Sequence, residues 1–152
     1  MTARAAGALA ATALLIPVLG CGDDENEGES FNADYQAETK QIEAIGGDIA
    51  RALTSASKRS NTALARQFDA LALRAQSSVD DLDELDPPED LTDERDDLIE
   101  ALETGTGDLR AIAAAARADE PAKARDAAKK LVDDSRAIRD ARGKLNRLTL
   151  KD

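Results

Sequence analysis

Apolar residues recur at steps of three, four and seven along most of the chain, which is the spacing typical of amphipathic α-helices. No run alternates apolar and polar residues as a strand does. Four apolar stripes follow the helical spacing: Ile42, Ile45, Ile49, Ala52 and Ala56; Leu64, Phe68, Leu71, Ala75, Leu82 and Leu85; Leu91, Leu98, Leu102, Leu109, Ile112 and Ala116; and Ala124, Leu131, Ile138 and Leu145. The second stripe places polar Ser78 in one core-facing slot.

Polar and proline-containing segments separate the stripes. The first stripe fades at residues 57–61, where Ser60 or Asn61 is a candidate N-cap of the next helix. The second ends before Pro87-Pro88, because proline disfavours helix in the residue before it. Thr92 is a plausible N-cap of the third helix. Asp119-Glu120-Pro121 stops that helix and starts the fourth, since proline suits a first helical turn.

Two glycine pairs interrupt the stripes. Gly46 and Gly47 should weaken or bend the first helix, which is predicted to begin near Ala33. Gly105 and Gly107 lie in the third stripe, where they allow a close helix contact or mark a bend.

Four segments of similar length with short connections predict an all-α domain, an antiparallel up-and-down bundle of about four helices over residues 33–150. Each helix should be roughly 35–40 Å long at 1.5 Å per residue. The core is rich in alanine, so it buries little apolar area per residue. A three-helix core with a loosely attached first helix is the alternative architecture.

The first 21 residues differ from the rest. Arg4 precedes an apolar run from Ala5 to Val18, and the composition turns acidic immediately after Cys21, the sole cysteine. A positive start, an apolar middle and a small residue at the cut, here Gly20, form a secretory signal. The run is shorter than the ~20 residues that span a bilayer.

Val18-Leu19-Gly20-Cys21 resembles the lipobox of bacterial lipoproteins. The resemblance covers these 21 residues alone and implies a diacylglyceryl thioether on Cys21, with cleavage just before it. Two acyl chains on one sulfur satisfy the two-signal requirement for stable anchoring. The alternatives are an ordinary cleaved signal peptide with Cys21 incidental, or an uncleaved apolar tail.

These observations divide the chain into three parts. Residues 1–20 are predicted to be the signal peptide, and residues 33–150 the helical domain. Residues 21–32 between them carry five acids after Gly22 and no base, so they are predicted to be a disordered acidic tether.

Composition excludes several functions. The chain has no histidine, which removes the commonest general base and metal ligand, and its formal charge of −11 disfavours nucleic acid. Its three aromatic residues make a sugar- or base-stacking platform unfavourable. No Ser or Thr has a histidine to activate it, so we expect no enzyme activity and no cofactor.

An acidic stretch at residues 80–103 contains thirteen carboxylates and one base, Arg95. Carboxylate oxygens are the ligands that Ca²⁺ prefers, and the candidates nearest the predicted turn are Asp83, Asp86, Glu89 and Asp90. The spacing of a calcium-binding loop is missing, so a solvated helix end and turn is the favoured interpretation.

Basic residues gather in the fourth stripe: Arg136, Arg139, Arg142, Lys144 and Arg147. In a bundle they would lie beside the acidic stretch. An alternative is that they face anionic lipid or wall polymer, although interspersed Asp133, Asp134 and Asp140 favour an ordinary solvated face.

The sequence therefore predicts a membrane-anchored lipoprotein on the extracytoplasmic face of the cell membrane, acting as a non-enzymatic interaction or accessory module of the envelope. Its expected partners are the membrane, through lipid on Cys21, and an envelope protein. A cation- or small-ligand-binding protein using residues 80–103 is the alternative.

Overall fold

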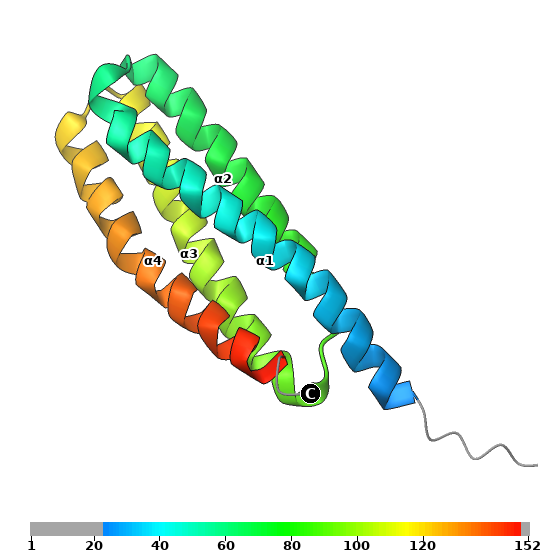
Figure 1. Cartoon of the computed structure of the whole chain (residues 1–152). Helices are drawn as coiled ribbons and strands as arrows, with labels where there is room; N and C mark the ends of the chain where they lie inside the picture. Colours follow the sequence, from blue (N-terminus) through cyan, green and yellow to red (C-terminus); the bar gives the residue numbers. More distant parts are fainter. Residues whose placement is uncertain (1–22, 150–152) are drawn as a thin grey trace, which may run out of the picture.

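The computed structural model describes residues 23–149, and the side chains from Ser30 onward within that range. Its helices are α1 (Asp23–Ser55), α2 (Asn61–Asp83), α3 (Thr92–Arg117) and α4 (Pro121–Thr149), with short 3₁₀ helices η1 (Ala56–Lys58) and η2 (Glu89–Leu91). The described residues contain no strand. Figure 1 shows the four long helices running up, down, up and down, which confirms the predicted all-α antiparallel bundle.

The predicted stripes form the core. Leu98, Leu109 and Leu145 are almost fully buried, and so is Ser78 in its core-facing slot. The buried residues gather into two clusters along the bundle. One contains Phe68 and Leu109, and the other contains Phe31, Tyr35, Leu82 and Leu98.

Helix α1 begins earlier than the sequence predicts. The helix starts at Asp23, so the expected tether at residues 21–32 is helical from Asp23 onward, and Phe31 is buried. Two physical causes act together: the sequence has acids at the start of this helix, which suits the positive end of its dipole, and Phe31 stacks on Tyr35 with 5.7 Å between ring centroids. With 33 residues α1 is about 50 Å long, against about 35 Å for α2 with 23.

The helix ends follow the sequence signals in part. The Ser60 side chain accepts a hydrogen bond from the Ala63 amide at 3.3 Å and caps α2, and Pro121 opens α4. Thr92 does not cap α3. The 3₁₀ turn η2 continues directly into α3, which makes Thr92 its first residue and leaves Leu91 as an N-cap without a side-chain hydrogen bond.

The glycines leave both helices continuous. Helix α1 runs through Gly46 and Gly47, and α3 runs through Gly105 and Gly107. Gly105 is buried, and a Cβ there would lie 3.1 Å from Ile138 Cδ1 of α4. A Cβ at Gly107 would meet nothing within 4 Å, so Gly105 alone of this pair serves the close helix contact.

The helices do not pack equally. Helix α3 packs along both α2 and α4, whereas α1 packs mainly on α2 and touches α4 at few places. Within this four-helix bundle the most extensive packing is therefore among α2, α3 and α4, with α1 held along one side. Within residues 23–149 no helix combines the length and apolar character needed to cross a bilayer.

Candidate functional site

The predicted lipidation residue, Cys21, lies outside the described residues. The acidic residues proposed as cation ligands lie around the α2–α3 connection. Asp83 is the last residue of α2, Asp86 lies in the loop, and Glu89 and Asp90 belong to η2. Among the described residues no three carboxylate or thiol side chains lie close enough together to hold a metal ion. The fold therefore does not assemble these candidates into a cation site.

The acidic stretch instead makes structural contacts. Arg95 Nη1 donates hydrogen bonds to the Asp83 carbonyl at 3.2 Å and the Leu85 carbonyl at 3.0 Å, which satisfies acceptors at the end of α2. Lys144 of α4 lies 3.3 Å from both Glu94 and Asp97 of α3. The basic fourth helix thus lies beside the acidic stretch, as predicted from its charge.

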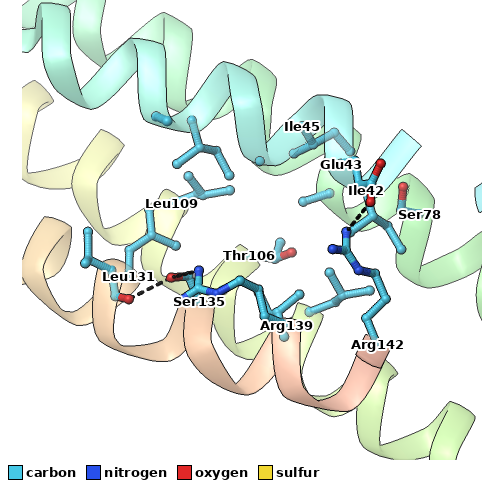
Figure 2. Close-up of a pocket in the computed structure, with 18 of the residues that line it drawn as sticks. Ile42, Glu43, Ile45, Ser78, Thr106, Leu109, Leu131, Ser135, Arg139 and Arg142 are labelled. Carbon is cyan, nitrogen blue, oxygen red and sulfur yellow. Dashed lines mark hydrogen bonds and ion pairs between the residues drawn. The ribbon is translucent and has the colours of Figure 1, made fainter. Parts of the chain in front are cut away.

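A groove lies between α1 and α4, floored by α2 and α3. Its cavity volume is about 400 Å³, and its wall is mainly aliphatic. Figure 2 shows Ile42 and Ile45 on one side, Leu131 on the opposite side, and Leu109 between them. A second hollow of about 480 Å³ also has Leu53 in its wall and is lined by the ends of the helices near η1.

Small side chains contribute to the wall of this groove. Gly46 and Ala50 of α1 line it beside isoleucines of the same helix, and Ser135 lines it from α4. An added Cβ at Gly46 would meet no atom within 4 Å, so a larger side chain at this position has open space beside it.

Two buried hydroxyl groups belong to the groove wall. Thr106 is 1% exposed, and its Oγ1 has no hydrogen-bond partner among the described residues. Ser78 of α2 is 2% exposed and also lines the groove, on the side of Ile42 in Figure 2. A buried hydroxyl without a partner costs roughly 1–3 kcal/mol, so Thr106 is a point where a bound polar group would add stability.

Two arginines of α4 belong to the same wall. Arg142 Nη1 lies 3.3 Å from Glu43 Oε1 of α1, and Arg142 Nε is buried without a partner. Arg139 Nη1 donates to Ser135 Oγ at 3.0 Å, and Ser135 Oγ donates to the Val132 carbonyl at 2.7 Å. Figure 2 shows the Arg142 guanidinium reaching across to Glu43 of α1, and the Arg139 guanidinium directed the other way along the groove, toward Ser135 and Leu131. Two arginines and one carboxylate are therefore the charged groups of an otherwise mainly apolar wall.

Tyr35 ties α1 to α4 close to the arginine end. Its hydroxyl donates to Asn146 Oδ1 at 2.7 Å, and the Arg142 carbonyl lies 3.4 Å away. Burial raises the pKa of Tyr35, and the Thr39 hydroxyl and the Arg142 charge oppose that rise. This contact fixes one end of α1, so the groove opens beyond it.

A separate polar cluster joins α3 to α4. Lys130 Nζ lies 3.0 Å from Asp108 Oδ1 and 2.6 Å from Asp134 Oδ2. Burial raises the pKa of Asp108 even though Lys130 favours its charged form, whereas the Lys130 ammonium lowers the pKa of exposed Asp134. Asp108 Oδ2 is buried without a partner, yet Asp108 does not line the groove. This cluster joins two helices and is no part of the site.

Sequence reasoning named Arg139 and Arg142 as part of a basic face but did not find the groove. Thr106 had no signal, because a threonine inside a helical stripe is usually solvated or bonded to its own helix. The signal that was available was the pair of small residues Gly46 and Ala50, four residues apart and next to the isoleucine stripe of the same helix. The chain matches no protein-family model, and neither the curated proteins nor the solved structures contain a significant match.

Proposed function

We propose that this protein is an extracytoplasmic lipoprotein, anchored to the cell membrane through Cys21, whose helical bundle is a non-enzymatic binding module of the cell envelope. The observation that carries the proposal is the lipobox-like Val18-Leu19-Gly20-Cys21, which is followed within two residues by the start of α1. A diacylglyceryl group would supply the two chains that stable anchoring requires.

The α1–α4 groove supports the binding role. Its volume of about 400 Å³ falls within the roughly 300–1,000 Å³ typical of ligand sites. Its wall combines apolar side chains with a few polar groups, which is the composition of such sites. The groove-lining face of α1 also offers an apolar surface of the kind on which an amphipathic partner helix docks.

The groove chemistry favours a role without catalysis. The chain has no histidine, and the Ser135 hydroxyl is already engaged with Val132 and Arg139. Glu43 is the one carboxylate in the wall of this groove, and it is paired with Arg142. Acid–base or nucleophilic chemistry needs a positioned base beside the reacting group, and this wall offers none. The alternative of a cation site at residues 80–103 finds no converging ligands among the described residues.

Labelling with radioactive palmitate tests the anchor. We expect label on the wild-type protein and none on Cys21→Ser, because the thioether requires that sulfur. The double variant Cys21→Ser/Ser57→Cys is the matched control, since it restores one thiol at an exposed position far from the signal sequence. Label retained by Cys21→Ser, or absent from the wild type, would contradict the proposed anchor.

Protease treatment of spheroplasts, in which any outer membrane is opened and the cytoplasmic membrane is intact, tests the location. Digestion of the helical domain from outside, with a cytoplasmic marker left intact, is the expected result. Protection of the domain until the cytoplasmic membrane is disrupted would place the domain in the cytoplasm and refute the proposed location.

A further inference from the structure

We propose that the α1–α4 groove binds a single-chain fatty carboxylate, with the alkyl chain along the apolar wall and the carboxylate at the arginine end. This inference rests on the proposed function, in which the groove is the binding surface, and it names the ligand class. Three observations on the groove carry it: its length, its positive end and its unpartnered hydroxyl.

The length of the groove suits one alkyl chain. The wall on α1 extends from Ile42 to Leu53, eleven residues apart, which corresponds to about 16 Å at 1.5 Å per residue. Carbon–carbon bonds of about 1.5 Å at angles near 111° advance about 1.25 Å per carbon, so about thirteen carbons span that distance. Beyond Leu53 the second hollow offers apolar space for a longer chain.

The charged end suits a carboxylate. Arg142 pairs with Glu43, whose side chain is 57% exposed, so a bound carboxylate would replace a contact with a mostly solvated partner. Arg139 lies farther along the groove, where its Nη1 donates to Ser135 Oγ at 3.0 Å, so Arg142 is the guanidinium group at the head-group end. Planar guanidinium groups bind carboxylates through paired hydrogen bonds, so Arg142 at one end of an apolar groove favours an anionic head group.

The hydroxyl of Thr106 supplies the third observation. It is nine-tenths buried or more, it lines the groove, and it has no partner in the described structure. Figure 2 shows it on the groove floor between Leu109 and the arginine end. A carboxylate oxygen at this place accepts the hydrogen bond that the hydroxyl otherwise leaves unmade.

Titration calorimetry with myristate tests the apolar part. The protein is the full chain carrying Cys21→Ser, so that no attached lipid competes for the groove. In this background we compare Gly46→Leu, which puts a side chain into the open side of the groove, with Gly107→Leu. Both glycines are exposed positions in long helices where a Cβ meets nothing within 4 Å, but only Gly46 lines the groove.

Saturable binding of one myristate by the Gly107→Leu protein, and its loss in Gly46→Leu, is the expected result. Equal binding by the two variants would show that the ligand does not occupy the groove and would overturn the proposal. So would binding of phosphatidylglycerol vesicles without binding of myristate, since that result requires a two-chain lipid surface.

A second comparison tests the head group. Arg142→Gln should weaken myristate binding by about tenfold, the loss expected for one charge-assisted hydrogen-bonded contact. It should leave binding of 1-tetradecanol, which lacks the charge, unchanged. Arg136→Gln is the matched control, because Arg136 lies on the same helix and does not line the groove. Equal weakening of both ligands by Arg142→Gln would contradict the placement of the carboxylate.

The two proposals fail separately. If palmitate labels Cys21 and myristate does not bind, the ligand inference is wrong and the anchored module stands. If myristate binds as described and Cys21 carries no lipid, the groove assignment stands and the anchor is wrong.

Discussion

Two glycines in α3 allow a direct measurement of how closely this helix packs on α4. Gly105 and Gly107 lie two residues apart in the interior of the same helix, so the intrinsic gain from replacing either one is the same. Their surroundings differ: a Cβ at Gly105 would lie 3.1 Å from Ile138 Cδ1 and 3.9 Å from Leu131 Cδ1, and one at Gly107 would meet nothing within 4 Å. The difference between matched substitutions therefore isolates the helix contact.

The expected magnitudes follow from these distances. Gly107→Ala should raise the free energy of unfolding by about 0.5–1 kcal/mol, the usual difference between alanine and glycine within a helix. At Gly105 the same gain is reduced to about 0–0.5 kcal/mol, because the Ile138 methyl group must yield by a few tenths of an ångström into the neighbouring groove. The leucine variants give the larger difference. The free energy of unfolding of Gly105→Leu should be about 1–3 kcal/mol lower than that of Gly107→Leu, which is the cost of overpacking.

Urea denaturation followed by circular dichroism gives the four free energies, and equal slopes against urea confirm that the unfolded states are comparable. A thermal melt should show the same order of stabilities. Equal stabilities for Gly105→Leu and Gly107→Leu would refute the reasoning, because they would mean that α4 does not press on Gly105.

Three further substitutions test other contacts. Tyr35→Phe removes the hydrogen bond to Asn146 from a fully buried ring, so it should lower the free energy of unfolding by about 0.5–1.5 kcal/mol in a urea titration; no change would mean that the bond is absent. Ser60→Ala removes the N-cap of α2 and should lower the free energy of unfolding by about 0.5–2 kcal/mol in the same assay. An unchanged free energy would contradict this role of Ser60. Burial raises the pKa of Asp108, so the native state prefers the protonated carboxyl, and stability present at low pH is lost as pH rises from 3.8 through the raised native pKa. Asp108→Asn carries no ionisable group at this position and avoids that loss. Its free energy of unfolding in urea should therefore rise relative to that of the wild type as pH increases across this range. A relative rise for the wild type would contradict the raised pKa of Asp108.

The architecture could be predicted because helical periodicity is a local property of the sequence. Leu98, Leu109 and Leu145 lie in heptad slots, and each is buried once the stripes face one another. Ser78 was recognised as core-facing from its slot alone. Pro121 marked a helix start because the constraint of the proline ring acts on its own backbone.

The groove and the true start of α1 could not be predicted, because both depend on contacts between distant segments. Residues 23–32 have the composition of a tether, yet Phe31 is buried in a cluster that includes Leu82 and Leu98, which follow it by more than fifty positions. The groove between α1 and α4 is lined by residues of all four long helices, among them Gly46 of α1 and Ser135 of α4, and these residues come together only when the helices are placed. The role of Arg95 was hidden for the same reason, since it binds carbonyl groups of the preceding helix.

Mass spectrometry of the amino-terminal peptide, taken from protein purified out of its native membrane, tests the central claim most directly. The account predicts that the peptide begins at Cys21 and carries the added mass of a diacylglyceryl group on its sulfur. A peptide that begins at any other residue, or a Cys21 with a free thiol, would contradict the account of an anchored envelope protein.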